Sequence, residues 1–393
     1  MPCSPSLPGC LTGGLRAPAL PPFAPLAILA ALLATTPLLA AEPWGGTAVP
    51  AEDLADVVGV AHVRGTYHHQ DGDFLNEGAE VIADLGSRVI KLYLMLPPAS
   101  TYPFGSEWPE VASLVELADT PHYREVFARP FSTFILTAYA VGRGDHYWLH
   151  GVTEAAYADE REQFYRLARH FLTEYRDSGK TFVLQHWEGD WAVRGSYDAE
   201  RDPTPTAIEG MIRWLQARQE GVDRAREEVG EKGVRVLHAA EVNLVTAAME
   251  EGRPSVTSDV LPLAGVDLVS YSAWETQHDA ERLREALDFI ARHAPRRPGI
   301  AGRHVFIGEF GLPENEHPPE AIRHVIDNCI PVGREWGCPY VVYWQVYCNE
   351  PRRQPVAANE DVRGFWLLRP DGSRGHAWNA LRAHLVGAGG PGE

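Results

Sequence analysis

The sequence predicts a (β/α)8 barrel of the TIM type, in which parallel strands form a closed ring inside a layer of helices. Three observations predict it. Eight strand-like segments occur along the chain, helix-like segments lie between most of them, and neither a long linker nor an internal repeat divides the 393 residues. We expect the barrel over residues 44–386, a leader over 1–41 and a flexible Gly/Pro-rich tail over 387–393.

The expected strands are short apolar runs, as is typical of parallel strands that are buried on both faces. In chain order they are Val57–His62, Arg88–Leu94, Ser132–Ala138, Thr181–Leu184, Val234–Ala239, Val266–Tyr271, His304–Ile307 and Tyr340–Trp344. The expected helices carry apolar residues at three- and four-residue spacing. They are Gly72–Leu85, Glu154–Arg176, Thr206–Val229, Ala280–His293 and Pro319–Trp336.

The connection between the second and third expected strands is unusually long. It runs over Pro97–Pro130 and holds Trp108 and a short helix, so we expect a lid or a wall of a substrate cleft there. The structural alternative is a doubly wound sheet, which carries a Gly-rich phosphate loop after its first strand. This chain reads Ala61-His-Val-Arg-Gly65 at that point, which disfavours the alternative.

The first residues are typical of a cleavable secretory signal. Arg16 is the one charge in the leader, the apolar stretch Leu26–Leu39 is broken by Thr-Thr-Pro, and Ala40-Ala41 precede Glu42. The stretch is too short and interrupted for a comfortable membrane span, although a retained N-terminal anchor is the alternative. We therefore expect a secreted or periplasmic protein with no other membrane association.

Charge and cysteine usage narrow the class of partner. A formal net charge of −18 disfavours nucleic acid and anionic membrane surfaces and fits a neutral substrate. Outside the leader the cysteines are Cys329, Cys338 and Cys348, which have no metal-ligand spacing and permit at most one intramolecular disulfide. Packing is their expected role.

Two glutamates end strand-like runs. Glu188 follows the fourth expected strand and Glu309 follows the seventh, so both lie at the rim where α/β folds place their chemistry. Strands four and seven lie on opposite sides of the mouth of a barrel. Two carboxylates that face a bond held between them are the equipment for retaining glycoside hydrolysis.

The surroundings of the two glutamates assign their roles. Trp187 and Trp191 flank Glu188, and apolar faces beside a carboxyl raise its pKa, so Glu188 is expected to be the acid/base. Glu309 precedes Phe310-Gly-Leu-Pro313, a turn that permits close approach by a sugar, so Glu309 is expected to be the nucleophile. No metal and no cofactor are expected.

Other carboxylates compete for the acid role. Glu241 ends the fifth expected strand and Glu275 follows the sixth, and either is an alternative acid or a hydrogen-bonding partner of the sugar in an outer subsite. Asp190 either tunes the pKa of Glu188 or caps the following loop. Tyr271 either orients Glu309 through its hydroxyl or serves packing.

Substrate-binding side chains are expected at several strand ends. Four of the 11 tryptophans cluster there, and aromatic faces suit the apolar faces of pyranose rings, while amides hold the hydroxyls. The histidines after the first strand line the sugar site or satisfy loop backbone. The expected residues are Trp187, Trp191, Trp274, Trp344, Gln185, Asn243, Gln345 and His68, with His62 and His69 beside it.

Three motifs support a family resemblance. Phe306-Ile-Gly-Glu309-Phe-Gly311 resembles the seventh-strand nucleophile motif of the clan A glycoside hydrolases, which include cellulase-like and mannanase-like barrels. Val342-Tyr-Trp344-Gln-Val-Tyr347 looks like the eighth strand of that clan, whose tryptophan floors the subsite for the cleaved sugar. The segment from Arg363 to Gly372 resembles its closing strand and turn.

The resemblance runs from about Val57 to Leu385 and implies a retaining glycosidase on a TIM barrel. Two departures point to a distant branch. The clan usually has Asn before its acid/base glutamate, where this chain has Trp187, and Arg late in the second strand, where this chain reads Lys91-Leu-Tyr-Leu94.

Two other classes of function remain as alternatives. One is a carbohydrate-binding or scaffold barrel that has lost its catalytic pair, which would keep the tryptophans without the paired carboxylates. The other is a metal-dependent hydrolase barrel, which would need His-x-His at the first strand and further His at later strand ends. The first strand reads Ala61-His-Val-Arg64, which disfavours the metal site.

Overall fold

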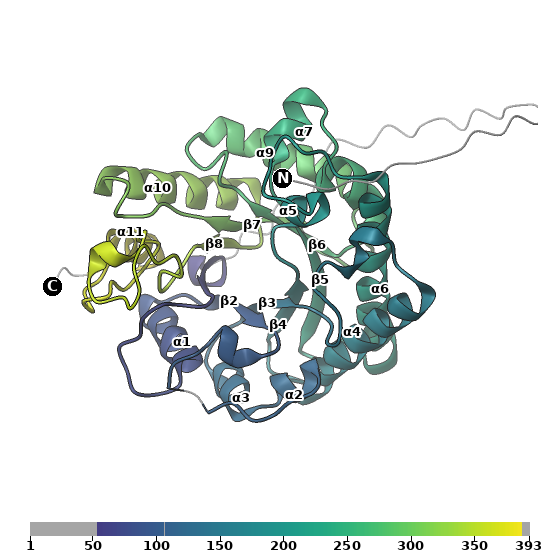
Figure 1. The fold of residues 1–393 in the computed structure, drawn as a ribbon, viewed down its shortest axis with the longest axis horizontal. Coiled ribbons are helices and arrows are strands. Elements are labelled where there is room, and N and C mark those ends of the chain that lie inside the picture. Colours follow the sequence, from purple (N-terminus) through teal and green to yellow (C-terminus); the bar gives the residue numbers. More distant parts are fainter. Residues whose placement is uncertain (1–52, 106, 387–393) are drawn as a thin grey trace, which may run out of the picture. The chain divides into compact units, whose positions relative to one another are not determined.

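The computed structural model describes residues 53–105 and 107–386, which form a closed barrel of eight parallel strands in the order β1 to β8 (Figure 1). Because β1 pairs with β8, the ring is complete. The predicted (β/α)8 fold is therefore confirmed. The leader and the tail expected from the sequence lie outside the described residues.

All eight strands lie where the apolar runs predict them. Their bounds are β1 (Val58–His62), β2 (Val89–Leu94), β3 (Thr133–Ala138), β4 (Thr181–Gln185), β5 (Arg235–Val242), β6 (Leu268–Ser272), β7 (Val305–Phe310) and β8 (Val341–Tyr343). Almost every strand residue is buried, because the barrel interior covers one face and the helices cover the other. The fifth strand extends beyond its predicted end, which places Glu241 inside it.

The longer helices cover the outside of the ring (Figure 1). They are α1 (Phe74–Leu85), α4 (Glu154–Glu174), α6 (Pro205–Val229), α9 (Ala280–His293), α10 (Pro319–Trp336) and α11 (His376–Val386). Side-chain oxygens fix several of their starts. Asp73, Thr153, Thr204 and Asp279 each accept a hydrogen bond from a backbone N–H in the first turn.

Shorter elements fill the connections. The short helices are α2 (Leu114–Ala118), α3 (Pro121–Ala128), α5 (Gly189–Arg194), α7 (Val245–Glu251) and α8 (Leu261–Ala264). Single turns lie at η1 (Leu54–Asp56), η2 (Pro98–Ser100), η3 (Tyr147–His150), η4 (Val256–Val260) and η5 (Asn359–Asp361). None of the helices in the described part of the chain is long and apolar enough to cross a membrane.

The long connection Pro97–Pro130 lies outside the ring. Its helices α2 and α3 sit between α1 and α4 (Figure 1), and Trp108 stacks on His122 at a ring-centroid distance of 4.1 Å. Of its described residues, none lines the cavity that contains Glu309. The expectation that this segment walls the substrate cleft is therefore not confirmed for that cavity.

The seventh strand is irregular beside its glutamate. The pairing of β6 with β7 shifts between Tyr271 and Ser272, so that Ser272 pairs with Glu309. Gly308 permits this shift, since a Cβ there would overlap Ser270 Oγ. Such irregularities re-aim side chains, and this one sets the direction in which Glu309 leaves the strand.

Candidate active site

The two predicted catalytic glutamates line one cavity at the carboxyl ends of the strands. Glu309 belongs to β7, and Glu188 is the residue before α5, in the connection after β4. The cavity has a volume of about 510 Å³. Its other lining residues are Trp187, Trp274, Gln277, His278, Gly311, Leu312, Pro313, His317, Trp344, Glu350, Arg363 and Phe365.

Glu309 is held by a buried lysine. The ammonium of Lys91, which comes from β2 and is fully buried, donates to Glu309 Oε1 at 2.7 Å and approaches the carbonyl oxygen of Gly308 at 3.4 Å. Burial raises the pKa of Glu309 to about 7, while the charge of Lys91 acts to lower it. The ion pair favours the ionised carboxylate that a nucleophile requires.

Glu188 has an unusual backbone conformation. Its φ of 42° and ψ of 66° lie in the left-handed region, which residues with a Cβ rarely adopt. Burial raises the pKa of its half-buried carboxyl to about 9, and the charges of Glu309 and Glu241 add to this rise. The carboxyl is therefore protonated at neutral pH, as a general acid must be.

Glu241 lies beneath these two residues. It is fully buried, and its Oε2 accepts hydrogen bonds from Lys91, Gln185 and Ser270, each at 2.9 Å. Burial alone would raise the pKa of Glu241, but Lys91 and the backbone N–H of Glu188 bring it below the ordinary value. Glu241 is therefore a buried anion, and it does not line the cavity, where it was expected as an alternative acid or a sugar contact.

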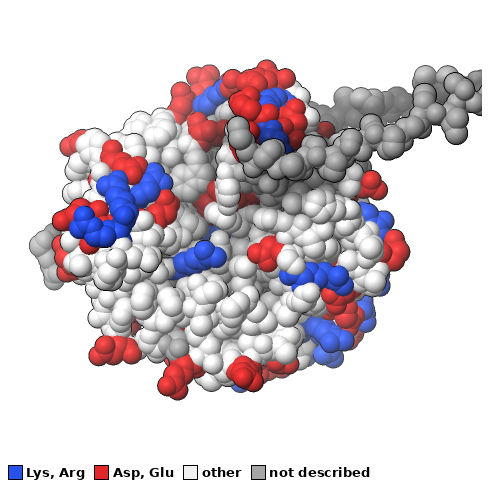
Figure 2. All heavy atoms as spheres, viewed as in Figure 1, with Lys and Arg blue, Asp and Glu red and all other residues white. Residues whose placement is uncertain are grey.

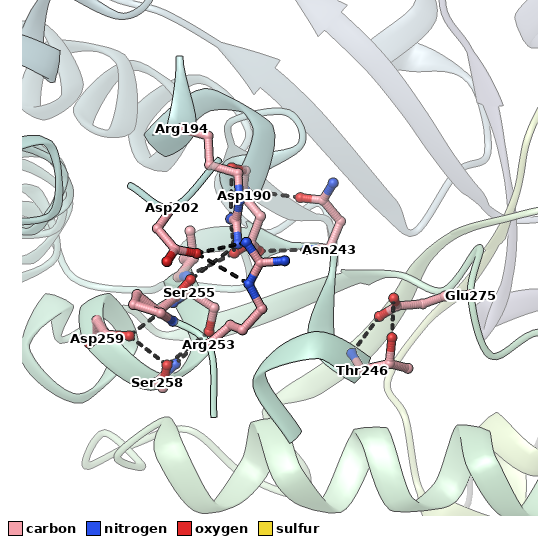
Figure 3. A network of polar contacts seen from close by, with 12 residues as sticks. Asp190, Arg194, Asp202, Asn243, Thr246, Arg253, Ser255, Ser258, Asp259 and Glu275 are labelled. Atoms are coloured by element: carbon pink, nitrogen blue, oxygen red, sulfur yellow. Dashed lines mark hydrogen bonds and ion pairs between the residues drawn. The ribbon is translucent and has the colours of Figure 1, made fainter. Parts of the chain in front are cut away.

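Glu275, the other alternative acid, is not among the residues that line the cavity. It is exposed, and its two oxygens accept hydrogen bonds from Thr246 N at 2.8 Å and Thr246 Oγ1 at 2.5 Å (Figure 3). These contacts satisfy the first turn of α7, where no other side chain caps the helix. The carboxylate thus caps α7 and does not line the cavity, where it was expected as an alternative acid or a sugar contact.

Asp190 anchors the loop after Glu188. It is fully buried, and its carboxylate accepts from Asn243 N at 3.0 Å and Val256 N at 2.9 Å, while Arg194 approaches it at 3.3 Å (Figure 3). Asn243 Oδ1 in turn accepts from Asp190 N at 2.9 Å. Of the two predicted roles for Asp190, its contacts fit that of holding the following loop. Asn243, which was predicted to bind the sugar, belongs to the same hydrogen-bond network.

The predicted aromatic residues divide between two hollows. Trp187, Trp274 and Trp344 line the cavity with Glu309. Trp191 lines an adjoining hollow of about 250 Å³, together with Trp187, Glu188 and the exposed Tyr197. Glu188 thus lies where the two hollows meet.

The remaining predicted site residues are buried or point elsewhere. Tyr271 is fully buried and its hydroxyl contacts Thr276 Oγ1 at 2.9 Å, so the predicted hydrogen bond to Glu309 is absent. Gln345 is fully buried, and neither of its side-chain polar atoms has a partner among the described residues. Gln185 donates to Glu241.

Of the histidines at and after the end of β1, His68 contacts loop backbone, which was one of the two roles predicted for them, and His62 contacts the first residue of α1. His62 is buried with its Nε2 2.9 Å from the carbonyl oxygen of Phe74. His68 is exposed, with its Nδ1 2.7 Å from the carbonyl oxygen of Gln70 and its ring stacked on Phe104. Neither lines the cavity with Glu309, where His68 was predicted to contact the sugar.

Several residues of the site were not predicted. Lys91 is the most important, and its substitution for the arginine usual in clan A was the one sequence signal that pointed to it. Gln277 accepts from Gly311 N at 2.8 Å, and Arg363 pairs with Glu350 at 2.6 Å. Gln277, Glu350 and Arg363 come from loops whose sequence carries no strand-end pattern.

Residues 53–105 and 107–386 contain no cluster of metal-ligating side chains. No three His, Cys, Asp or Glu side chains group there in a way that could hold a metal ion. Cys329, Cys338 and Cys348 are buried and unpaired with one another. Packing, their predicted role, accounts for their positions.

No family model matches the sequence, and no curated protein is similar enough to count as a match. Solved structures with a similar fold are glycoside hydrolases. One is a family 5 broad-specificity endoglucanase from Clostridium longisporum, with a TM-score of 0.52, 12% identity, and coverage of 84% of this chain and 96% of that one. Another is a family 5, subfamily 18 enzyme from Streptomyces cattleya in complex with Manβ1-4GlcNAc, with a TM-score of 0.51, 14% identity, and coverage of 84% and 80%.

A family 39 glycoside hydrolase from Bacteroides cellulosilyticus WH2 matches with a TM-score of 0.50 and 12% identity. The match covers 84% of this chain but 63% of the family 39 chain, so this chain spans less than two thirds of its length. At such identities the likeness shows a shared fold. This chain therefore shares the barrel fold of these glycoside hydrolases.

Proposed function

We propose that the protein is a secreted retaining glycoside hydrolase that acts on a neutral poly- or oligosaccharide. Glu309 is the nucleophile and Glu188 the acid/base. The observation that carries the proposal is the environment of the two glutamates in one cavity. Burial raises the pKa of Glu309, beside Lys91, to about 7 and that of Glu188 to about 9. Because its pKa is lower, Glu309 is the one that ionises first, and Glu188 keeps its proton.

In the first step, the Glu309 carboxylate attacks the anomeric carbon and forms a glycosyl ester. Glu188 donates its proton to the glycosidic oxygen, so the leaving group departs as a neutral alcohol. Forming the ester removes the charge of Glu309. Because that charge raises the pKa of Glu188, the pKa of Glu188 falls once the ester has formed.

In the second step, the ionised Glu188 takes a proton from a water molecule that attacks the same carbon. The ester bond to Glu309 breaks, and the carboxylate returns to its ion pair with Lys91. Two displacements at one carbon leave its configuration unchanged. Each glutamate thus ends in the protonation state in which it began.

The cavity walls support a carbohydrate substrate. The indoles of Trp187, Trp274 and Trp344 offer faces on which pyranose rings can stack, and Trp274 is itself braced by Phe365 at 5.8 Å. Solved structures with the same fold are named for action on glycans or hold a disaccharide. The secreted location rests on the leader over residues 1–41.

Purified protein incubated with a panel of β-glucan, β-mannan and xylan tests the proposal. We expect hydrolysis of at least one polymer, with products that retain the anomeric configuration by proton NMR in the first minutes. Binding of a polymer without product would instead indicate a carbohydrate-binding barrel. Products of inverted configuration would contradict the double displacement.

A further inference from the structure

We propose that Glu241 is a positioning residue whose carboxylate joins the two glutamates of the cavity: one oxygen fixes the backbone of Glu188 and the other holds Lys91 against Glu309. The catalytic consequence rests on the proposed function. The geometric claim does not, because it concerns contacts that are present without substrate.

The first oxygen of Glu241 holds the left-handed turn. The backbone N–H of Glu188 donates to Glu241 Oε1 at 2.7 Å. The turn also lies directly against β5, because a Cβ on Gly189 would overlap the carbonyl oxygen of Glu241 and approach the ring of His186 to 2.8 Å. His186 Nε2 accepts a hydrogen bond from the backbone N–H of Glu241 at 3.1 Å, so the residues after β4 are also bonded to β5.

The second oxygen of Glu241 reaches the other side of the barrel. Its donors are Lys91 of β2, Gln185 of β4 and Ser270 of β6, each at 2.9 Å. Lys91 lies between two carboxylates, since its ammonium is also 2.7 Å from Glu309 Oε1. The side chains of Lys91 and Glu241 are 0% exposed and that of Glu309 is 2% exposed, so water cannot replace these contacts.

A carboxylate is required at this place because four donors converge on it. Two acceptor oxygens can serve the Glu188 N–H on one side and the donors from Lys91, Gln185 and Ser270 on the other. The amide of glutamine has one acceptor oxygen and one donor group. Glu241→Gln would therefore face an N–H₂ group toward either Glu188 or Lys91, and one of the two connections would be lost.

The groups around Glu241 make the electrostatic effect of this substitution predictable. The titratable and charged groups that face it are Lys91, Tyr93, Tyr139, His186, Glu188 and Glu309. Burial lowers the pKa of His186 to about 3 and raises the pKa of both tyrosines, so these three stay neutral near pH 7. The charge of Glu241 raises the pKa of both Glu188 and Glu309, so its removal lowers both.

Carbon NMR on full-length protein labelled with ¹³C at the glutamate side-chain carboxyls tests the proposal without any substrate. Glu188→Gln and Glu309→Gln assign the two signals that titrate near and above neutral pH. In Glu241→Gln we expect both titrations to move to lower pH by about 1 unit or more, as the loss of a nearby like charge requires. Unchanged titrations of both glutamates would overturn the proposal.

The matched control is Asp267→Asn. Asp267 is also a buried carboxylate with several donors, including His238 N at 3.0 Å and Arg226 at 3.0 Å, but it precedes β6 at the opposite end of the barrel. We expect it to lower the melting temperature and to leave both titrations in place. If Asp267→Asn moved them as far as Glu241→Gln does, the effect would be a general loosening and not positioning.

Kinetics distinguish positioning from a general loss of structure. On aryl β-glucosides and β-mannosides, Glu241→Gln is expected to lose about 10²-fold in kcat with a poor leaving group, because a displaced Glu188 delivers its proton badly. The loss should be much smaller with 2,4-dinitrophenyl, which departs without a proton. An equal loss with both leaving groups would contradict positioning. If the wild type hydrolyses no glycoside, the proposed function fails, while the NMR titrations still decide the role of Glu241.

Discussion

Glu188, Glu241 and Glu309 are near neighbours at the carboxyl ends of the strands, yet their carboxyl groups have different electrostatic surroundings. Glu241 meets four donors and is an anion, Glu309 meets the ammonium of Lys91, and the carboxyl of Glu188 faces two neighbouring negative charges. Burial, together with the donors and charges around each carboxyl, therefore sets its protonation state. Nothing in the local sequence of a glutamate carries that count.

The positions of Glu188 and Glu309 at the carboxyl ends of the strands were predictable because each ends a short apolar run of the sequence. Lys91 was not, because its partners Glu241 and Glu309 are 150 and 218 residues away along the chain. Only closure of the ring brings β2, β5 and β7 to face one another. For the same reason the sequence left Glu241 open as an acid, although the barrel buries it completely.

Removing the lysine should destabilise the protein in a pH-dependent way. Lys91→Gln leaves Glu241 and Glu309 buried without their cation, and breaking a buried pair in this way costs about 3–5 kcal/mol. The loss should be largest near pH 8 and smaller at pH 5, where the carboxyls take up protons. Urea unfolding at both pH values measures it, and wild-type stability at pH 8 would contradict the buried ion pair.

The raised pKa of Glu188 should make the folded protein less stable as the pH rises. Its pKa is about 9 in the folded protein against an ordinary value of 4.5, so between these values the folded state binds more protons than the unfolded one. Stability then falls with rising pH, with a slope that approaches about 1.4 kcal/mol per pH unit. We expect Glu188→Gln to become more stable relative to wild type from pH 5 to pH 9.

Thermal melts of the two proteins at several pH values check this difference. The exposed Glu275→Gln serves as the control. A difference between Glu188→Gln and wild type that stays constant across the range would show that Glu188 is ionised in the folded protein at neutral pH.

Regular strands carry Lys91 and Glu241, but short irregular pieces of the chain orient the two glutamates of the cavity. Asp73 and Asp279 start helices α1 and α9 where capping chemistry predicts a start. The turn at Glu188 and the shift in pairing beside Glu309 were not predictable, because α5 is too short for a periodic pattern and a shift of pairing depends on the neighbouring strand. The site therefore depends on the pieces of structure that sequence patterns describe least.

Gly308 gives an element-scale test. Gly308→Ala would push a methyl group into Ser270 Oγ, which donates to Glu241, and overpacking of this kind costs about 1–3 kcal/mol. We expect a lower melting temperature and lower activity, and partial recovery in the double variant Gly308→Ala/Ser270→Ala. The control Gly144→Ala adds its methyl where no atom lies within 4 Å and should change little. No recovery in the double variant would contradict the contact.

The whole molecule combines a barrel with a strongly acidic composition. Asp and Glu side chains, together with Lys and Arg, gather mainly at the edge of the face in Figure 2, and the formal net charge is −18. The alternation of strands and helices made the barrel predictable, because that pattern extends over the whole chain and single errors do not change it. The role of the segment 97–130 was not predictable, since its packing beside α1 and α4 depends on the finished ring.

Expression of the full-length protein tests the prediction that it is exported. If residues 1–41 are a cleaved signal, full-length protein expressed in a bacterial host with a signal peptidase should be recovered outside the cytoplasm with Glu42 as its first residue. Intact mass and N-terminal sequencing give the answer. Recovery of the uncleaved chain in the membrane fraction would instead indicate a retained anchor.

If Glu309 is the nucleophile, it forms a covalent ester with the sugar, and this ester can be trapped and located. A 2-deoxy-2-fluoro glycosyl fluoride of the sugar found in the glycan panel should add one glycosyl unit to the intact protein, because the fluorine slows hydrolysis of the ester. We expect peptide mapping to place the sugar on Glu309, with no addition in Glu309→Gln. A label on Glu188 or Glu241, or hydrolysis of the glycan with no label at all, would show that Glu309 is not the nucleophile.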